Sequence, residues 1–250
     1  MIHSFLLIGQ SNMAGRGRIE EAVPFDTTGI SVLRNGRWRA MYRPVNPDRK
    51  TSGVCLAESF AARYVQDHPG VKVGLIPCAD GGTRIDQWLP GTRLFDHAVF
   101  QAKLAMRSST VAGILWHQGE SDSENDRYLV HEKKLKLVLD TMRKELDLWD
   151  VPVLVGGLGD FLNGYNNGSH DQWPRINEAM EKLTQSDPRM AFVPAEGLGH
   201  NGDSLHFSAA ALYEFGNRYY EAFRPLEDPN KVFTEKEDPD KAIRTNLEDL

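Results

Sequence analysis

Residues 3–13 read HSFLLIGQSNM, an apolar run that ends in a glycine and a group of short polar side chains. The apolar residues are continuous rather than alternating with polar ones, which is typical of a strand buried on both faces of a parallel sheet. Gly9 and the polar residues that follow it indicate a turn. The stretch therefore predicts a buried first strand and, directly after it, a loop at the edge of the sheet.

Four more apolar runs repeat this pattern along the chain, at residues 71–77, 111–117, 151–156 and 190–194. Apolar residues with helical spacing lie between or after these runs, at 57–65, 135–146 and 212–219, and less regular helices are expected at about 94–107 and 173–184. Strand and helix alternate five times. This alternation predicts an α/β domain with helices on both faces of the sheet.

The composition is that of a globular protein. Of the 250 residues 40% are apolar, and the formal net charge is −6. We expect one domain over residues 1–226 and an acidic tail or short appended helix over 227–250, where eight acidic residues outnumber four basic ones. The acidic balance argues against a nucleic-acid partner, and no apolar run is long enough for a membrane-spanning helix.

Two further features concern the compartment. Cys55 and Cys78 are too few for a disulfide framework and favour two buried thiols in a reducing environment. Residues 1–9 lack the charged and long apolar regions of a secretory signal. We therefore expect a cytoplasmic protein, with secretion left open if a leader has been trimmed. The sequence does not indicate the oligomeric state.

Ser11 follows the first predicted strand directly. Ligands of open parallel sheets bind beyond the carboxyl ends of the strands, so this position faces a site. If a helix begins at Ser11, its first N–H groups can face a developing oxyanion, and Gly9 permits a close approach of the backbone. Ser11 is therefore a candidate nucleophile. The alternative is an ordinary helix N-cap serine.

Asp203 and His206 lie in a glycine-rich loop after the last predicted strand. Histidine titrates nearest to neutral pH and can remove the proton of a serine hydroxyl. A carboxylate three residues earlier can orient the imidazole. The alternatives are an ordinary loop histidine and an Asx-turn aspartate. His200, six residues before His206, is the rival base.

Three residues after other strands are candidate oxyanion donors, together with the N–H group of Ser11. The adjacent Gly81 and Gly82 can point a backbone N–H into a site without a Cβ in the way. Gln118 offers a side-chain amide donor. The alternatives are a tight turn for the glycines and a strand-end residue bonded to backbone for Gln118.

Four blocks of the sequence, taken in this order, resemble those of the SGNH hydrolases. They are GQSNM at 9–13, GGTRIDQW at 81–88, WHQGE at 116–120 and DSLH at 203–206. The resemblance is greatest to the sialate O-acetylesterase-like branch, which includes the acetylxylan esterases of carbohydrate esterase family six. It covers about residues 3–223.

This resemblance implies a three-layer α/β/α sandwich with a flavodoxin-like central parallel sheet of about five strands. It implies Ser11 as nucleophile, His206 as base and Asp203 as the group that orients the base. The implied reaction is two-step acyl transfer without metal or cofactor. The oxyanion would be held by N–H groups of Ser11 and of one glycine, and by Gln118.

Five residues are expected to bind substrate or to support the site: Gln10, Asn12, Arg84, Trp88 and Glu120. Trp88 would pack on a sugar ring and Arg84 would bind an acidic sugar, with core packing and a solvated loop charge as the alternatives. Glu120 begins an acidic cluster at 120–126 that lacks the ligand pattern of a calcium or zinc site. This cluster is expected to be a solvated helix start in which Glu120 orients its neighbours.

The expected function is a serine esterase that removes acetyl groups from an acetylated carbohydrate, such as a xylo-oligosaccharide, another glycan or sialic acid. One alternative is a lipase- or thioesterase-like hydrolase, for which long apolar loops would be needed; the loops here are polar. The other alternative is a non-catalytic carbohydrate-binding module, against which the presence of Ser11, Asp203 and His206 argues.

Overall fold

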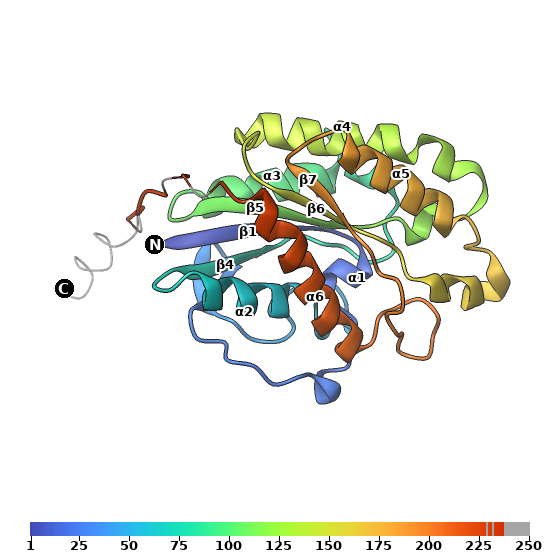
Figure 1. Cartoon of the computed structure of the whole chain (residues 1–250), viewed down its shortest axis with the longest axis horizontal. Coiled ribbons are helices and arrows are strands. Elements are labelled where there is room, and N and C mark those ends of the chain that lie inside the picture. The colour runs from blue at the N-terminus through green and yellow to red at the C-terminus, as the bar shows by residue number, and fades with distance from the viewer. Residues whose placement is uncertain (229, 232, 238–250) are drawn as a thin grey trace.

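A seven-stranded sheet runs through the computed structural model, which describes residues 1–228, 230, 231 and 233–237 (Figure 1). The strands lie in the order β3-β2-β4-β1-β5-β6-β7. Their bounds are β1 Ile2–Gly9, β2 Ile30–Arg34, β3 Arg37–Ala40, β4 Lys72–Pro77, β5 Thr110–His117, β6 Val153–Gly156 and β7 Met190–Val193. The β2–β3 pair is antiparallel and the other neighbours are parallel.

The five strands predicted from the sequence are β1, β4, β5, β6 and β7. Their order, β4-β1-β5-β6-β7, is the flavodoxin-like order 2-1-3-4-5. The predicted fold class is thus confirmed. Neighbours β1 and β5 flank the point where the strand order reverses, which is where ligands bind in such sheets.

The structure adds an edge hairpin, β2–β3, that the sequence analysis did not predict. Its strands are short, and on β3 only Trp38 is partly buried, so neither strand has a long apolar run. The signal that was overlooked is Asn35-Gly36, where both residues have positive φ angles of 49° and 74°. Asn-Gly in that conformation is the preferred two-residue hairpin turn.

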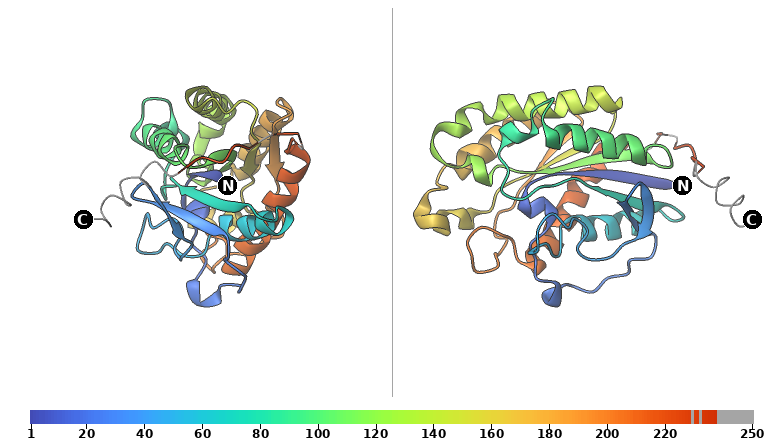
Figure 2. Two further views of the ribbon diagram at one scale, coloured as in Figure 1. Left: turned by 90° about the vertical axis from the view of Figure 1, so that its left-hand side faces the viewer. Right: turned by 180° about the vertical axis from the view of Figure 1, so that it is seen from behind.

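Helices cover both faces of the sheet (Figure 2). One layer contains α2 (Ala57–Asp67) and α6 (Ala209–Phe223), and the other contains α3 (Arg93–Ala105), α4 (Tyr128–Leu146) and α5 (Trp173–Gln185). A four-residue helix, α1 (Ser11–Ala14), follows β1. The five longer helices are those that the sequence predicted.

The central strand β1 divides its side chains between two hydrophobic cores. Phe5 and Leu7 belong to the core beneath α2 and α6, whereas Leu6 and Ile8 belong to the core beneath α3, α4 and α5. Successive side chains of a strand point to opposite faces. Because both faces are covered by helices, every position from Phe5 to Ile8 is buried, which explains the continuous apolar run.

Residues 238–250 of the predicted acidic tail lie outside the described residues, so the proposed division at residue 227 remains a prediction. The described part of the tail contacts the N-terminal half of the chain. Glu227 pairs with His68 Nε2 at 3.0 Å, and the ring of Phe233 stacks on that of His3 at 3.7 Å between centroids. This part is therefore packed rather than wholly solvated.

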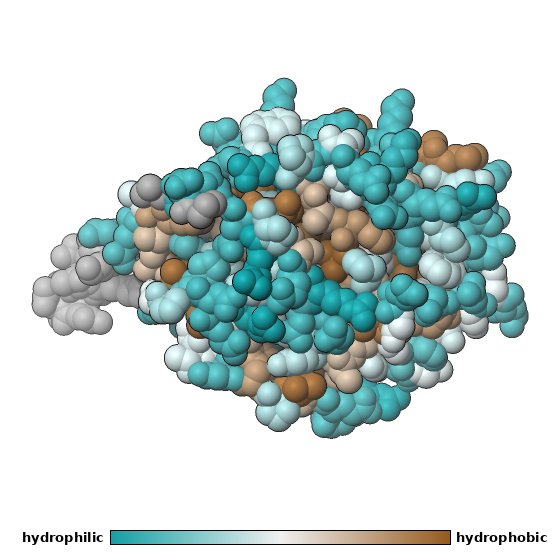
Figure 3. All heavy atoms as spheres, in the orientation of Figure 1, coloured by the Kyte–Doolittle hydropathy of each residue, from teal (hydrophilic) through white to brown (hydrophobic). Residues whose placement is uncertain are grey.

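The face shown in Figure 3 is mostly hydrophilic, with apolar side chains in small groups. Within the described ranges, no helix combines the length and the apolar content that crossing a membrane requires. Cys55 and Cys78 are both buried and free, as predicted. Burial raises the pKa of each thiol.

The crossing of α2 and α6 generates a stability prediction. A Cβ on Gly216 would lie 2.0 Å from the carbonyl oxygen of Leu56 and 2.1 Å from Ser59 Oγ. Replacing an exposed helical glycine by alanine stabilises by about 1 kcal/mol. We expect Gly216→Ala instead to lower the free energy of unfolding by about 1–3 kcal/mol, because the helices must move apart. Urea denaturation measures this change.

The matched control is Asn217→Ala, which raises helix propensity at the next position of the same helix. It should leave the free energy of unfolding unchanged or raise it slightly. If Gly216→Ala proved as stable as Asn217→Ala, close helix contact at Gly216 would not limit the packing.

Candidate active site

Ser11 is the first residue of α1 and lies where β1 ends. The turn depends on Gly9, whose φ is +138°, because a Cβ there would come within 2.0 Å of the carbonyl oxygen of His117 on β5. Gln10 N–H donates to the same carbonyl oxygen at 2.9 Å. The first N–H groups of a helix have no intrahelical acceptor. The N–H of Ser11 is therefore available at the carboxyl edge of the sheet.

His206 connects Ser11 to Asp203. His206 Nε2 is 3.2 Å from Ser11 Oγ, and His206 Nδ1 is 2.7 Å from Asp203 Oδ2. An ionised carboxylate only accepts hydrogen bonds, so Nδ1 carries the hydrogen and Nε2 is left to accept one from the Ser11 hydroxyl. This arrangement can draw the proton from Ser11 and make its oxygen a nucleophile.

Asp203 is held in its ionised form by its own loop. Asp203 Oδ1 accepts hydrogen bonds from the N–H groups of Leu205 and His206, at 3.0 and 2.9 Å. Partial burial raises the pKa of this carboxyl, but these bonds and the His206 side chain outweigh it and hold the pKa below its usual value. Asp203 thus forms the Asx-turn with one carboxylate oxygen and contacts the His206 ring with the other.

The His200 imidazole is used within its own loop. Its Nδ1 accepts hydrogen bonds from the N–H groups of Gly202 and Ser204, both at 3.0 Å. The imidazole within hydrogen-bonding distance of Ser11 Oγ is therefore that of His206 and not that of His200.

Asn12 clamps the His206 loop to the start of α1. Asn12 Oδ1 accepts from the N–H of Phe207 at 3.1 Å, and Asn12 Nδ2 donates to the carbonyl oxygen of Leu205 at 3.1 Å. These two residues flank His206 on either side. Asn12 Nδ2 also donates to Glu120 Oε1 at 2.5 Å. One amide therefore fixes the spacing between Ser11 and His206.

Glu120 is fully enclosed, which corrects the expectation of a solvated acidic cluster. Glu120 and Asp122 are each only 1% exposed. Burial alone raises the pKa of Glu120, but His117, whose Nε2 lies 3.1 Å away, and the Asn12 amide outweigh it and hold the pKa below its usual value. Glu120 orients Asn12, as expected from the sequence; both contacts are to Oε1, while the buried Oε2 has no hydrogen-bond partner among the described residues.

Gly81 and Gly82 occupy different positions beside Ser11. Gly81 N–H donates to Asp48 Oδ2 at 2.8 Å, and a Cβ on Gly81 would lie 3.4 Å from Ser11 Cβ. Gly82 has a positive φ of 75°, and a Cβ there would meet nothing within 4 Å. Within the described part of the chain the Gly82 N–H has no hydrogen-bond acceptor. Gly82 is therefore the glycine with a free donor.

Gln118 does not present its amide to the site, which corrects the expectation that it donates to an oxyanion. Its Nε2 donates to Asp122 Oδ2 at 2.5 Å and to the carbonyl oxygen of Thr83 at 3.1 Å. A further contact of 3.3 Å runs to Gln10 Oε1. An amide nitrogen has two hydrogens, so these acceptors use both. Gln118 instead anchors the loop that contains the glycines.

Three of the other predicted site residues have supporting or peripheral positions. Trp88 is fully buried; its ring packs against Trp116, and its Nε1 donates to Thr83 Oγ1 at 3.1 Å. Trp88 cannot offer a face to a sugar, so that expectation is corrected to a supporting role. Gln10 is buried beside Gln118, and Arg84 is exposed at the start of a 3₁₀ turn.

Sequence analysis missed Asn46 and Asp48. Asp48 forms a buried two-pronged ion pair with Arg16, at 3.0 and 2.8 Å, and also binds Gly81 N–H. Asn46 exchanges two hydrogen bonds with the backbone of Ala79, at 2.9 and 3.0 Å. Together they fix the loop at residues 78–83, which contains Gly81 and Gly82 and which we call the glycine loop, against the segment that follows α1. The sequence NPD at 46–48 indicates only a turn, and nothing in it points to the site.

A groove of about 580 Å³ opens beside Asp203 and His206. Its other walls come from the segments after α1 and before α2 and include Arg18, Glu20 and Lys50. Besides Arg16, which pairs with Asp48, the groove thus contains two cationic side chains and two anionic ones, Glu20 and Asp203. Among the described residues no group of three or more His, Cys, Asp or Glu is placed to hold a metal ion.

Comparisons with known proteins show the family and the fold. A family model described as carbohydrate esterase, sialic acid-specific acetylesterase matches residues 1–225. A probable carbohydrate esterase of Arabidopsis thaliana is 26% identical over 245 residues, covering 88% of this chain and 89% of that protein. An Arabidopsis thaliana protein of known X-ray structure has a TM-score of 0.80 at 25% identity, covering 89% of this chain and 98% of that chain.

Two further solved structures share the fold. NanS has a TM-score of 0.71 at 18% identity and covers 90% of this chain and 97% of its own. A carbohydrate acetylesterase from Xanthomonas citri has a TM-score of 0.67 at 19% identity and covers 90% of this chain and 56% of its own.

The Asn12 clamp generates the second stability prediction. Asn12→Asp removes a donor from Glu120 and places a second buried carboxylate against it. We expect the free energy of unfolding to fall by about 3–5 kcal/mol at neutral pH, because an uncompensated charge is left inside the protein. Urea denaturation at neutral pH measures this.

The control makes the same chemical change on the surface. Asn163 is exposed and uses its side-chain oxygen to accept from Trp173 Nε1 at 2.9 Å, so Asn163→Asp keeps the acceptor. Asn163→Asp should change stability by less than about 0.5 kcal/mol. A comparable small loss for Asn12→Asp would show that the clamp is not required.

Proposed function

The chain belongs to the carbohydrate esterase family of sialic acid-specific acetylesterases, and we propose that it removes acetyl groups from a carbohydrate with Ser11 as the nucleophile. The observation that carries the proposal is the continuous connection from Ser11 Oγ through His206 to Asp203. This connection lies at the reversal point of the sheet, where ligands of such sheets bind, and His206 and Asp203 line the adjoining groove.

The reaction follows from the direction of these hydrogen bonds. His206 Nε2 takes the proton of Ser11 while Ser11 Oγ attacks the acetyl carbonyl carbon. The imidazolium, stabilised by Asp203, then gives its proton to the departing sugar oxygen, and the acetyl group stays on Ser11. Water repeats the sequence with His206 as base, which releases acetate and restores the serine.

The tetrahedral oxyanion needs donors that nothing else uses. The N–H of Ser11 at the start of α1 and the N–H of Gly82 meet that condition. Gly81 does not, because its N–H already binds Asp48. We assign the oxyanion hole to these two backbone donors. Gln118 supports it indirectly, because its amide donates to the carbonyl oxygen of Thr83 in the loop that contains the glycines.

The groove favours an acidic sugar over a long acyl chain. Arg18 and Lys50 line it beside His206, and most of the residues that line it have polar or charged side chains. A carboxylate-bearing sugar such as sialic acid can pair with these charges, whereas an acyl chain lying against them would strip them of water without offering a partner. This supports an acetylated acidic sugar as substrate and disfavours a lipase- or thioesterase-like activity.

The nucleophile assignment is tested with 4-nitrophenyl acetate. Ser11→Ala and His206→Ala should each lower kcat by about 10³-fold or more, and Asp203→Asn by about 10²–10⁴-fold, because each breaks the proton path. His200→Ala is the matched control and should keep nearly full activity. Equal rates for Ser11→Ala and the unaltered protein would overturn the assignment, as would loss of activity in His200→Ala alone.

The substrate preference is tested by a change in kcat/KM. Replacing both Arg18 and Lys50 by alanine should lower kcat/KM for an O-acetylated sialic acid by about three- to tenfold, as expected for exposed charge pairs. The value for neutral acetylated xylobiose should stay unchanged, because that sugar has no carboxylate. Equal losses on both substrates would argue against recognition of an anionic group.

A further inference from the structure

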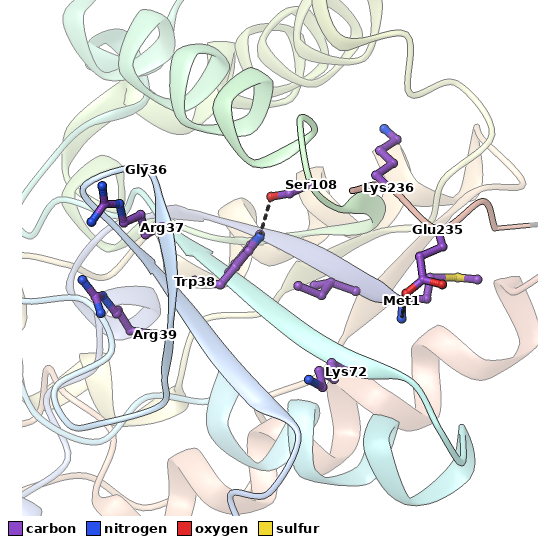
Figure 4. A pocket seen from close by; sticks show the side chains of 10 residues that line it. Met1, Gly36, Arg37, Trp38, Arg39, Lys72, Ser108, Glu235 and Lys236 are labelled. Carbon is purple, nitrogen blue, oxygen red and sulfur yellow. Dashed lines mark hydrogen bonds and ion pairs between the residues drawn. The ribbon is translucent and has the colours of Figure 1, made fainter. Parts of the chain in front are cut away.

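The β2–β3 hairpin presents three arginines on one face. Arg34 and Arg37 lie directly opposite each other in the strand register, and Arg39 is two residues further along β3, on the same face. Figure 4 shows Arg37 and Arg39 on one side of β3 and Trp38 on the other. With Asn35 and Tyr42, these arginines line a hollow of about 620 Å³, which we call the arginine face.

Like charges directly opposite each other in an antiparallel pair are destabilising. Arginines nearby in the chain each have a carboxylate partner: Arg16 pairs with Asp48, Arg43 with Glu58 and Arg49 with Asp80. Over the described ranges, no carboxylate pairs with any arginine of the arginine face. The chain as a whole is acidic, with a net charge of −6, so this local excess of positive charge is distinctive.

Charged side chains on an edge strand can also serve only to discourage pairing with another sheet. A charge that only discourages pairing does not need a fixed orientation, whereas the guanidinium group of Arg34 is held by hydrogen bonds. Its nitrogens donate to the carbonyl oxygens of Pro44 and Val45 and to Tyr42 Oη. These acceptors are neutral, so they orient the guanidinium without compensating its charge.

The strand that holds the other two arginines is also anchored. Trp38 Nε1 donates to Ser108 Oγ at 3.1 Å, and its ring lies so close over Gly74 that a Cβ there would come within 2.6 Å (Figure 4). A pocket of about 360 Å³ beside the hairpin is lined by Trp38, Ser108 and Lys72, and also by Arg37, Arg39 and Glu235. Trp38 thus holds β3 against the sheet, and this fixes the backbone positions of Arg37 and Arg39 on the other side of the strand.

We propose that the arginine face binds carboxylate groups of an acidic polysaccharide, outside the acetyl-removing site. Arginine guanidinium groups bind carboxylates through paired hydrogen bonds, and among the described residues those of Arg37 and Arg39 have no acceptor. Arg34 already donates to four acceptors, so it contributes its charge rather than a paired contact. The Tyr42 ring, 51% exposed and 5.5 Å from the Arg34 guanidinium carbon, gives a sugar ring an apolar surface beside the charges. The choice of a saccharide over other anions rests on the proposed function.

The location suits a polymer that also reaches the groove. Arg34 bonds to Val45, and Val45 lies three residues before Asp48, which holds the glycine loop beside Ser11. Three residues of chain span at most about 11 Å. The arginine face is thus tied through a short segment to the loop beside Ser11, and a polymer long enough to span both sites would have a raised local concentration at Ser11.

Binding of polygalacturonate, measured by calorimetry in low salt, tests the proposal. The unaltered protein should bind it, and Arg37→Ala/Arg39→Ala should bind at least about tenfold more weakly. The control Arg175→Ala/Lys182→Ala removes the same charge from exposed positions on α5 and should bind within twofold of the unaltered protein. Equal losses in both double variants, or no loss in the first, would overturn the site.

Two further arms fix the ligand class and separate this proposal from the esterase assignment. A neutral β-glucan should not bind, and double-stranded DNA that bound more tightly than polygalacturonate would overturn the saccharide assignment. Hydrolysis of 4-nitrophenyl acetate by Arg37→Ala/Arg39→Ala should match that of the unaltered protein. If the unaltered protein lacks esterase activity but the binding results hold, the proposed function fails and the anion site stands.

Discussion

The buried negative charge of Glu120 is the constraint on which the candidate site depends. A carboxylate enclosed at 1% exposure must be compensated by neighbours. The amide of Asn12 and the ring of His117 supply this compensation from α1 and from β5. Because the same Asn12 amide also bonds to both sides of His206, satisfying Glu120 sets the distance between the histidine and Ser11.

A second buried network fixes the opposite side of the site by the same logic. Asp48 is ionised inside the protein because Arg16, Ser52 and the Gly81 N–H all donate to it; burial opposes ionisation, but these contacts hold its pKa below the usual value. An N–H group that already donates within the protein cannot also donate to the substrate. Counting which N–H groups remain free therefore separates Gly82 from Gly81 and sets Gln118 aside.

Charge is distributed unevenly over a chain that is acidic overall. Buried charges form pairs, whereas cationic side chains remain at the groove beside His206 and on the β2–β3 hairpin. The connection from Tyr42 to Asp48 joins these two regions, since Arg34 bonds to its beginning and Gly81 to its end. The fold thereby connects two surfaces with cationic side chains through one short segment of chain.

The sequence by itself determined the five central strands, the helices between them and the blocks that contain Ser11, Gly82 and His206. It could do so because strand burial on two faces and helical spacing are local patterns, and each block lies at the end of a strand or in the loop that follows it. The hairpin escaped prediction because its strands are short and half exposed. Only the tertiary structure decided that Trp88 and Gln118 face inward, that Glu120 is buried and that Asp48 reaches Gly81. Those outcomes depend on which donor meets which acceptor across segments distant in sequence, and local patterns do not contain that information.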